Sequence, residues 1–566
     1  MPRFTPAGAR LRRYRDARLE ALRSGQPIDE IDERREVEHA AWLDRALERS
    51  SRLEPERART LDAVMTGSTP TATGVSRRDL LRAGALGAVA LGGVGALTSG
   101  AAAAAAAGGR TSAPRIAVVG AGLAGLTAAY EVAKRTGWQA QVFEASTRVG
   151  GRVWTLRGAA GGQFLERGGG GVNSRDRNLL RLAGELGLTP LVDTWLNYPR
   201  SSAVFSFGGK SYTWPQLRPG VRAIEDYAWN IWRQIKYVPT HDRHNPTARV
   251  WDHRSVADLI DATAHPRTTP AGSYVAHWFG GEYGGRAAHA SALHYVMDAG
   301  GAYPGGGFDE RFCIPGGNDT LATTLAGRLP PGGVTLDRLL VALVRHADNT
   351  YRLTFASSDG STHSVVADRV ILAVPPTTLR EVDLSRAGIS RLHRAQIDRQ
   401  PLGTGAKLNV QFTGQPWKDA GHTGDGSSDT SVQMSWSQQF QATDPANLVI
   451  LDNLRGDYLG STPAHGVAAP AVRHRVLRDL TRWYPTAATA MIPTSTYLDY
   501  WPNDPFAKGT WSFYDLGGFT TYGGVERRRE GHIHFAGETT APFVEHSTMC
   551  GAVTSGIRVA REIASY

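Results

Sequence analysis

Three glycines and one acidic residue near residue 120 have the types and the spacing needed to bind a pyrophosphate. Gly120, Gly122 and Gly125 follow a G-x-G-x-x-G pattern, and Glu144 lies about 20 residues further along the chain. Glycines in such a turn let the backbone approach the phosphates, and the amino end of the following helix attracts their negative charge. A carboxylate at position 144 can accept hydrogen bonds from ribose hydroxyl groups. The pattern therefore predicts a bound adenine dinucleotide.

A lysine in an apolar segment is the second candidate for chemistry. Lys407 lies in the strand-like run AKLNVQF, residues 406–412. A buried ammonium group is costly, and burial lowers its pKa toward the range in which it can transfer a proton. The alternative is an edge-strand lysine whose amino group extends into the solvent. Together with the glycine pattern, this segment favours a buried, catalytic Lys407.

Regular elements must hold these residues in place. An apolar strand is predicted over 116–119, a helix after Gly125 and a second strand over 139–143, which ends at Glu144. This strand, turn and helix are typical of a doubly wound domain, and the alternative is such a domain with another ligand.

The carboxyl-terminal segment is predicted to contain a strand, a turn and a helix. The strand covers 533–536, Gly537 and Glu538 form the turn, and Ser547 caps a helix with an apolar stripe from Met549 to Ile563. The amino end of this helix can stabilise negative charge on a bound ligand. The alternative is a terminal helix that only packs on a sheet.

Several segments of the chain resemble the flavin amine oxidase family, which contains monoamine oxidases, polyamine oxidases and L-amino acid oxidases. They include a second glycine turn, RVGGR, at 148–152, the segment ERGGGG at 166–171 and HFAGETT at 534–540. The resemblance spans residues 114 to 566 and implies FAD, because a second glycine turn with arginines can wrap the far side of a pyrophosphate. The FAD-binding positions that it implies, together with the first glycine turn, are Gly120, Gly122, Ala124, Gly125, Glu144, Ala145, Gly151, Arg152, Gly169, Gly170, Val341, Gly537, Glu538 and Met549.

The same resemblance assigns the catalytic side chains. In the family, a lysine at the position of Lys407 holds a water against flavin N5, and an aromatic residue at the position of Trp511 lies at the flavin face. Such an aromatic wall excludes water and favours a neutral amine. Thr510 stands where some monoamine oxidases have a cysteine bonded to flavin, so we expect noncovalent FAD. Thr548 replaces a second cage tyrosine that some members have.

After Thr510 and Thr548, a third difference from the family leaves the identity of the substrate undetermined. Gly171 stands where animal L-amino acid oxidases have an arginine that grips the substrate carboxylate. Either the substrate has no α-carboxylate, or another arginine binds that group.

The resemblance implies an FAD-dependent amine oxidase. Such an enzyme oxidises a primary or secondary amine, or an amino acid, by hydride transfer to flavin N5, and molecular oxygen restores the flavin with release of hydrogen peroxide. The alternatives are an L-amino acid oxidase specifically, a flavoenzyme of the desaturase or protoporphyrinogen oxidase type, and a non-catalytic flavin-binding protein. Lys407 and the stretch around Trp511 argue against the desaturase type.

We expect an α/β fold with two discontinuous domains. The resemblance implies a Rossmann-like FAD-binding domain from 110–187, 307–395 and 506–566, and an α+β substrate-binding domain of the amine oxidase type from 188–306 and 396–505. A chain of 566 residues with 41% hydrophobic residues can bury cores of this size. Trp229 and Trp232, at helical spacing, are predicted to be core residues.

The amino-terminal part is predicted to direct export. Residues 1–75 form a charged extension, and 76–109 resemble a twin-arginine signal, with SRRDLL before a weakly apolar stretch. We expect the twin-arginine translocation machinery to export the folded protein to the periplasm, the cell envelope or the medium. The alternative is an uncleaved anchor, although so many glycines and alanines make a poor membrane span.

The net charge and the two cysteines predict few further binding partners or sites. The formal net charge of +10 permits attraction to anionic surfaces, but no nucleic-acid-binding motif is present, so we expect no nucleic-acid partner. Cys313 and Cys550 allow at most one disulfide, and the sequence has no metal-ligand spacing. A homodimer is compatible with the sequence, which does not fix the oligomeric state.

Overall fold

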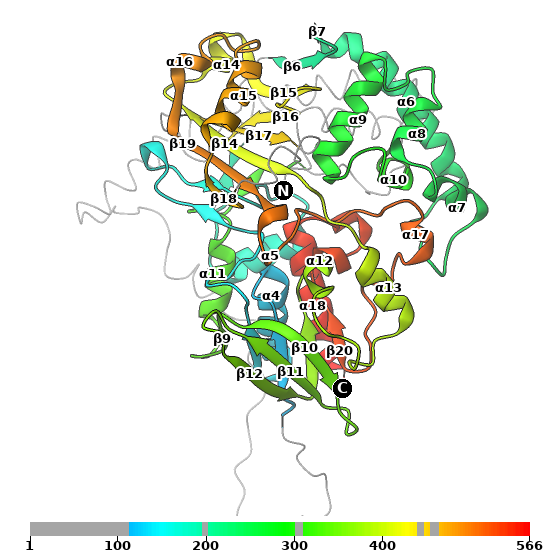
Figure 1. Ribbon diagram of the computed structural model, residues 1–566, viewed down its shortest axis with the longest axis vertical. Coiled ribbons are helices and arrows are strands. Elements are labelled where there is room, and N and C mark those ends of the chain that lie inside the picture. The colour runs from blue at the N-terminus through cyan, green and yellow to red at the C-terminus, as the bar shows by residue number, and fades with distance from the viewer. Residues whose placement is uncertain (1–112, 195–201, 300–308, 439–445, 453–462, 566) are drawn as a thin grey trace, which may run out of the picture. The chain divides into compact units, whose positions relative to one another are not determined.

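The computed structural model describes residues 113–194, 202–299, 309–438, 446–452 and 463–565 (Figure 1). The predicted charged extension, 1–75, and the whole signal-like segment, 76–109, lie outside these residues. Residues 114–565 belong to one compact unit.

A five-stranded parallel sheet carries the first glycine turn. Its strand order is β20-β13-β1-β2-β9. The strands are β1 (Ile116–Val119), β2 (Ala140–Phe143), β9 (Val334–Thr335), β13 (Arg369–Leu372) and β20 (Ile533–Phe535). All four residues of β1 are buried, as expected for a parallel strand covered on both faces. The predicted strands at 116–119 and 533–536 are thereby confirmed to within one residue.

Two helices from opposite ends of the described chain pack against each other beside this sheet (Figure 1). Helix α4 (Leu123–Thr136) begins directly after Gly122 and ends at Gly137, which has a φ of 74°. Helix α18 (Met549–Ala564) crosses α4 so closely that a Cβ atom at Gly556 would lie only 2.6 Å from the Ala124 carbonyl oxygen. This crossing brings the two segments with the nucleotide-binding signatures together.

A three-stranded antiparallel sheet follows in the chain. It contains β10 (Leu339–Arg345), β11 (Tyr351–Ala356) and β12 (Thr362–Ala367). The turn between β11 and β12 contains Gly360, whose φ of 82° favours glycine.

The second large sheet has eight strands and contains Lys407. Its order is β18-β19-β14-β17-β16-β15-β6-β7. The strands are β6 (Ser202–Phe207), β7 (Lys210–Tyr212), β14 (Ala406–Phe412), β15 (His422–Ser428), β16 (Met434–Ser437), β17 (Ala446–Asp452), β18 (His465–Val467) and β19 (Met491–Tyr500). Strand β14 lies between β17 and β19, and all seven of its residues are buried.

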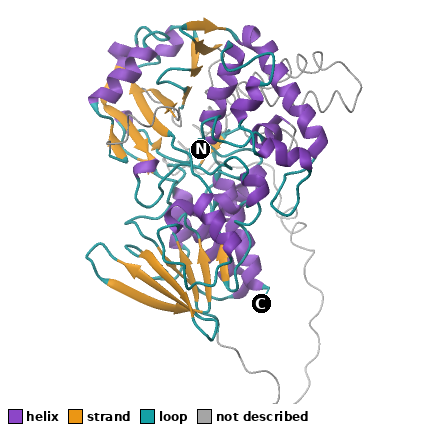
Figure 2. Ribbon diagram, turned by 45° about the vertical axis from the view of Figure 1, so that its right-hand side comes forward, coloured by secondary structure: helices purple, strands orange, loops and turns teal. Residues whose placement is uncertain are grey.

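A group of helices packs beside the eight-stranded sheet (Figure 2). It contains α6 (Trp214–Ile235), α7 (Pro246–Asp252), α8 (Val256–Asp261), α9 (Pro270–Tyr283) and α10 (Leu293–Ala299). Trp229 is buried in the core of this group, which confirms its prediction as a core residue, whereas Trp232 is only partly buried and packs against that core.

Short strand pairs and further helices connect these layers. The strand pairs are β3 (Thr155–Leu156) with β4 (Leu165–Glu166), and β5 (Val192–Asp193) with β8 (Phe312–Cys313). The helices are α5 (Arg177–Glu185), α11 (Thr320–Gly327), α12 (Pro376–Leu379), α13 (Arg391–Arg399), α14 (Pro416–Asp419), α15 (Pro470–Leu480), α16 (Ala487–Ala490) and α17 (Gly518–Thr521).

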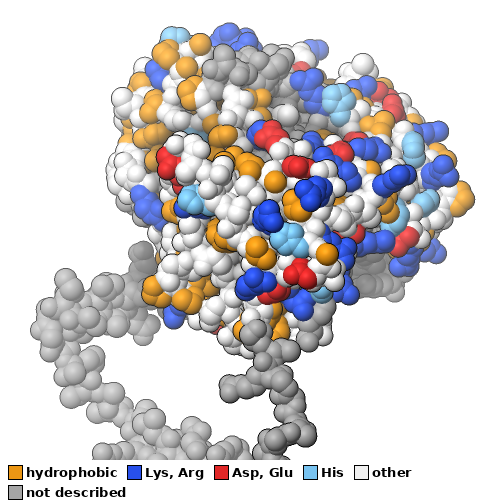
Figure 3. Space-filling view, turned by 60° about the horizontal axis from the view of Figure 1, so that its bottom comes forward, with side chains coloured by type: hydrophobic (Ala, Val, Ile, Leu, Met, Phe, Trp, Pro, Cys, Tyr) orange, Lys and Arg blue, Asp and Glu red, His pale blue; other side chains and the backbone are white. Residues whose placement is uncertain are grey.

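The predicted fold class is confirmed: a Rossmann-like parallel sheet is combined with a second, mixed sheet and its helices. Among the described residues, no helix has the length and apolar character needed to cross a membrane. The same part of the chain has no group of His, Cys, Asp or Glu residues arranged to hold a metal ion. On the face in Figure 3, basic and acidic side chains are interspersed.

Candidate active site

A cavity of about 650 Å³ connects segments from both ends of the described chain. Its walls contain most of the predicted FAD-binding residues and the predicted aromatic residue. These are Gly120, Gly122, Ala124, Glu144, Ala145, Gly151, Arg152, Gly169, Val341, Trp511, Gly537, Glu538 and Met549. Three predicted residues, Gly125, Gly170 and Lys407, lie behind the walls, and the contacts of each are described below.

The first glycine turn forms part of the cavity floor between β1 and α4. Gly120 has a φ of +102°, a conformation that favours glycine, and a Cβ atom there would lie 2.7 Å from the Ala373 carbonyl oxygen. A Cβ atom at Gly125 would lie 2.0 Å from the Gly120 carbonyl oxygen. A Cβ atom at Gly122 would meet nothing within 4 Å. Gly120 and Gly125 thus keep the turn tight, while Gly122 leaves room for a ligand.

Glu144 fastens this turn from the end of β2. Its Oε2 atom accepts a 2.7 Å hydrogen bond from the Ala121 N–H, and its Oε1 atom accepts bonds from the N–H and hydroxyl groups of Ser146. The carboxylate therefore lies at the cavity wall with its orientation fixed. This position is compatible with the predicted ribose contact.

Replacing Glu144 by alanine should weaken FAD retention by about tenfold to a hundredfold, the usual size of a lost hydrogen bond to a charged group. Glu144→Gln keeps an acceptor oxygen and should lose less affinity. The flavin content after dialysis and the FAD dissociation constant check this expectation. A Glu144→Ala protein that retains full flavin content and unchanged affinity would contradict it.

A second glycine turn lies against the first. Gly150 has a φ of +103°, and its N–H donates a 2.9 Å hydrogen bond to the Ala121 carbonyl oxygen. Arg148 folds back on the turn, since its Nη2 atom donates to the Gly151 carbonyl oxygen at 2.8 Å. The two turns are therefore rigidly paired at one side of the cavity.

Arg152 and Glu538 join the two remote segments by an ion pair. Arg152 Nη1 lies 2.8 Å from Glu538 Oε1, and Glu538 Oε2 accepts hydrogen bonds from the Ser512 hydroxyl group and the Ser547 N–H. Burial acts to raise the pKa of Glu538, but the charge of Arg152 and these hydrogen bonds outweigh it, so the pKa is lowered. Glu538 thus stays ionised and holds Arg152 at the cavity wall.

The amino end of α18 forms another part of the wall. Thr548 is its N-cap, and the Thr548 hydroxyl oxygen accepts the Gly551 N–H. The prediction that Ser547 caps this helix is wrong by one residue, because Ser547 has a φ of +66° and donates its hydroxyl hydrogen to the Ser512 carbonyl oxygen. Met549 contacts the segment after β4, since a Cβ atom at Gly169 would lie 2.8 Å from its sulfur.

Val341 reaches the cavity from β10. A bulge between Leu340 and Ala342 removes Val341 from the regular register with β11, and its carbonyl oxygen accepts the Asp383 N–H. The backbone at this position is thus displaced from the sheet ladder. Its role in binding FAD remains a prediction from the family resemblance.

Lys407 is buried, as expected, with an exposed fraction of 5%. Its ammonium group donates a 3.1 Å hydrogen bond to the Gly168 carbonyl oxygen, and a Cβ atom at Gly170 would lie 3.2 Å from Nζ. Burial lowers the pKa of Lys407 to about 8, although negative charges at Glu166, Asp499 and Glu310 act to raise it. The lysine therefore lies behind the glycine segment whose residue Gly169 lines the cavity.

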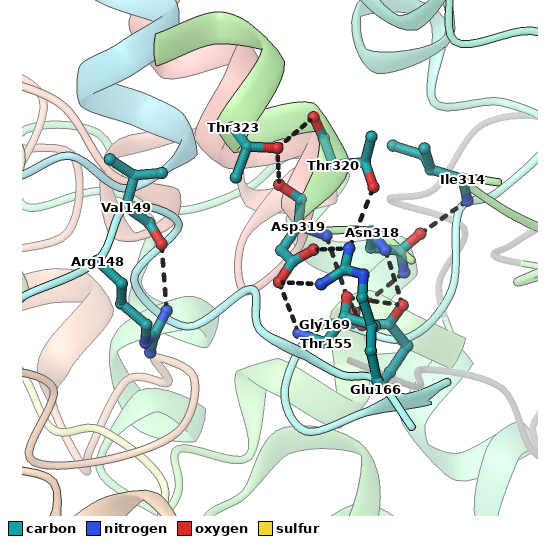
Figure 4. A network of polar contacts seen from close by, with 11 residues as sticks. Arg148, Val149, Thr155, Glu166, Gly169, Ile314, Asn318, Asp319, Thr320 and Thr323 are labelled. Carbon is teal, nitrogen blue, oxygen red and sulfur yellow. Dashed lines mark hydrogen bonds and ion pairs between the residues drawn. The ribbon is translucent and has the colours of Figure 1, made fainter. Parts of the chain in front are cut away.

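Glu166 and Asn318 organise this glycine segment, and neither is among the predicted site residues (Figure 4). Asn318 donates from Nδ2 to the carbonyl oxygens of Gly169 and Gly170, both at 3.1 Å, and its N–H donates to Glu166 Oε1 at 2.7 Å. Burial raises the pKa of Glu166 to about 7. The glycine-rich segment around Glu166 is a visible signal in the sequence, whereas nothing at Asn318 indicates its partners.

A row of charged groups extends from Lys407 across neighbouring strands. Lys407 pairs in register with Asp499 of β19, and Asp499 pairs with His465 of β18. Asp499 Oδ1 lies 2.8 Å from both His465 Nδ1 and Arg167 Nε. Burial acts to lower the pKa of His465, but hydrogen bonds to Asp499 and Asp504 outweigh it, so the pKa is raised. Because His465 also lines the cavity, this row connects the lysine to the cavity wall.

Trp511 and Thr510 occupy the segment that faces α18. The Trp511 ring lines the cavity on one side and lies against Gly284 on the other, where a Cβ atom would be 2.9 Å from the ring. Thr510 is buried, and the described cavity walls contain no cysteine. Cys313 and Cys550 are both buried and free rather than joined in a disulfide.

The cavity residues fit an adenine dinucleotide with a flavin. Two glycine turns leave backbone space beside a helix amino end, a carboxylate ends β2, and an arginine is fixed at the wall. The residues that would hold FAD are therefore present and preorganised.

Comparison with known proteins supports this interpretation. Residues 123–564 match the model of the family described as flavin containing amine oxidoreductase. A Mycobacterium tuberculosis protein, AofH, is 28% identical over 473 residues, which cover 80% of this chain and 96% of AofH. Putrescine oxidase of Kocuria rosea is 27% identical over 478 residues, which cover 79% of this chain and 94% of that protein. The solved structure of a putrescine oxidase bound to putrescine has a TM-score of 0.67 and 26% identity, and covers 80% of this chain and 99% of that chain.

The family match covers more than half of the chain, and it agrees with the paired glycine turns and the buried lysine. The chain belongs to the flavin-containing amine oxidoreductase family, and it is an FAD-dependent enzyme that oxidises an amine.

Proposed function

We propose that this chain is an exported amine oxidase in which Lys407 and Trp511 act at a noncovalently bound FAD. The observation that carries the proposal is the convergence of remote segments on one cavity. Both glycine turns and the amino end of α18 line that cavity, and Lys407 is buried behind Gly169, with its ammonium group bonded to the Gly168 carbonyl oxygen. When bound, FAD supplies a hydride acceptor for the amine, and molecular oxygen reoxidises it to give hydrogen peroxide.

The chain's own residues prepare an amine for oxidation in three ways. Trp511 presents a flat apolar wall that excludes water from one side of the site. Lys407, whose pKa of about 8 lies near neutrality, can hold a water or exchange a proton at Nζ. The amino end of α18, whose residues Thr548 and Met549 line the cavity, provides positive potential there.

Noncovalent binding is proposed because a threonine stands at position 510 and the described cavity walls contain no cysteine thiol. Denaturing the yellow protein with acid should therefore release all of the flavin into the supernatant. Absorbance of the supernatant and of the protein pellet checks this result. Flavin that remains in the pellet would show a covalent bond.

Export is proposed from the sequence SRRDLL and the weakly apolar stretch that follows it. The signal is tested by comparing the wild type with the double variant Arg77→Lys, Arg78→Lys. The amount and the intact mass of each protein are measured in the fraction outside the cytoplasm. Loss of export in the double variant is expected, and unchanged export would contradict the proposal.

The oxidase function is tested by mixing the purified protein anaerobically with a panel of amines and amino acids. A substrate should bleach the flavin absorbance, and admission of oxygen should restore it with one equivalent of hydrogen peroxide. Bleaching only by a polyene or a porphyrinogen would instead indicate the desaturase or protoporphyrinogen oxidase type. No bleaching by any compound would indicate a non-catalytic flavin-binding protein.

A further inference from the structure

Three charged side chains from three neighbouring strands lie on one face of the eight-stranded sheet. His465 of β18 is directly opposite Asp499 of β19, and Asp499 is directly opposite Lys407 of β14. Directly opposite residues of an antiparallel pair point to the same face, with Cβ atoms about 4.5–5.5 Å apart. Asp499 therefore lies between the histidine and the lysine, and its negative charge acts on both.

Both ring nitrogens of His465 face carboxylate oxygens. Nδ1 lies 2.8 Å from Asp499 Oδ1, and Nε2 lies 3.0 Å from Asp504 Oδ2. Burial acts to raise the pKa of Asp504, but the hydrogen bonds that it accepts, first among them the bond from His465, outweigh burial, so the pKa is lowered. A carboxylate oxygen only accepts hydrogen bonds, and only the protonated imidazole ring has two N–H donors. The two contacts therefore hold His465 as an imidazolium ion.

Two tryptophan rings pack against this imidazolium ion. The Trp154 and Trp501 rings lie edge-on to it, with ring centroids 5.0 and 4.6 Å away. The guanidinium groups of Arg167 and Arg148 stack on Trp154, at 3.8 and 4.2 Å from its centroid. Burial, and then the charge of Arg167, act to lower the pKa of His465, but hydrogen bonds to the two carboxylates outweigh both, so the pKa is raised. The His465 side chain is 13% exposed and lines the cavity, so protons can reach it from there.

Asp499 pairs with two cations through one of its oxygens. Its Oδ1 atom accepts hydrogen bonds from Arg167 Nε and His465 Nδ1, both at 2.8 Å. The side chain is completely buried, and its Oδ2 atom accepts no hydrogen bond from the described residues. One negative charge thus neutralises two fixed cations in addition to its effect on Lys407.

The charge of Lys407 depends on a balance between burial and the surrounding carboxylates. Burial favours the neutral amine, whereas Glu166, Asp499 and Glu310 favour the ammonium ion. The help from Glu166 is incomplete near neutral pH, because burial raises its pKa to about 7. Since Asp499 is already paired with two other cations, burial prevails, and the lysine can lose its proton near neutral pH.

We propose that His465 is a positioning residue that acts on Lys407 through Asp499. Its imidazolium ion pairs with the carboxylate that would otherwise stabilise the lysine ammonium ion, and the lysine can then be a neutral amine during catalysis. This inference rests on the proposed role of Lys407 at the FAD, and it adds a residue of the cavity wall to the groups that control that role.

The first test replaces His465 by glutamine, which keeps a hydrogen-bond donor but has no charge. In the FAD-loaded enzyme, the rise in the rate of flavin reduction near pH 8 should move to higher pH. We expect a shift of about 0.5 to 1 pH unit, because a positive charge roughly 10 Å from Lys407, two strand spacings away, is removed. His474→Gln, at an exposed position on α15, is the matched control and should cause no shift. An unshifted pH profile in His465→Gln at full flavin content would overturn the proposal.

A second test measures the charges without turnover. In protein labelled with carbon-13 at histidine Cε1, the His465 resonance is the one that disappears in His465→Gln. Its titration midpoint should lie above about 6.5, the ordinary pKa of histidine. Because coupling between two sites is reciprocal, Lys407→Met should raise this midpoint by a similar amount, about 0.5 to 1 pH unit, whereas Lys418→Met should not.

The two tests separate failure of the His465 role from failure of the enzyme function. A His465 midpoint at or below about 6.5, or a midpoint that is equal in the wild type and in Lys407→Met, would overturn the role of His465. If the midpoints shift as expected but no amine bleaches the flavin, the coupling of His465 to Lys407 is supported and the amine oxidase function fails.

Discussion

Replacing Lys407 by methionine should slow flavin reduction by about 10²- to 10⁴-fold, the usual contribution of a positioned acid or base, while FAD stays bound. Methionine preserves the length and apolar stem of lysine but removes the group that donates to the Gly168 carbonyl oxygen. Because Lys407 lies behind the cavity wall rather than in it, cofactor retention should not depend on its charge.

Anaerobic stopped-flow measurement of flavin reduction across pH checks this prediction. The pKa of Lys407, lowered by burial to about 8, implies that its amine is neutral above that pH and can accept a proton. The rate of flavin reduction in the wild type should therefore increase as the pH rises through about 8, and it should be lower at more acidic pH. In Lys407→Met this change of rate near pH 8 should be absent. Lys418→Met, at an exposed position on α14, is the matched control. Unchanged rates in both half-reactions would remove Lys407 from the mechanism.

Replacing Gly125 by alanine should abolish FAD binding. The added Cβ atom would lie 2.0 Å from the Gly120 carbonyl oxygen, whereas carbon and oxygen atoms rarely approach closer than about 3.3 Å. Either α4 or the first glycine turn must move, and both form the cavity floor. We expect the purified variant to lack the yellow flavin colour, and added FAD should not restore that colour.

Gly184→Ala provides the matched control for this change. Gly184 is also a helical glycine, on α5, but a Cβ atom there would meet nothing within 4 Å. Alanine should stabilise this helix by about 0.5–1 kcal/mol and leave flavin content unchanged. Circular dichroism and thermal melting of both variants separate loss of FAD from loss of folding. A folded Gly125→Ala protein with full flavin content would contradict the role of the tight turn.

The local elements of this fold could be predicted because their signals are local. The strand before Gly120, the helix after the glycine turn and the strand at 406–412 each follow from apolar pattern and glycine placement within a short window, although the helix begins at Leu123 rather than after Gly125. The burial of Lys407 also follows from its neighbours in the strand, since every residue of β14 is buried. The family resemblance then supplied the long-range arrangement that periodicity alone does not contain.

The positioning contacts could not be predicted, because they depend on pairing between distant segments. Asn318 bonds the carbonyl oxygens of Gly169 and Gly170 across about 150 residues of chain, and no pattern around Asn318 indicates this. The row Lys407, Asp499 and His465 exists only through the order of β14, β19 and β18. The helix cap moved from Ser547 to Thr548 because two adjacent hydroxyl residues offer equivalent signals, and the backbone conformation decides between them.

The central claim is that the remote glycine and carboxyl-terminal segments enclose one FAD, with the Lys407 ammonium group at its reactive nitrogen. A crystal structure of the FAD-loaded protein tests this most directly. We predict FAD in the cavity between α4 and α18, with Lys407 Nζ within about 6 Å of flavin N5, the span of two hydrogen bonds through one water. FAD bound elsewhere, or a lysine remote from the ring, would contradict the account.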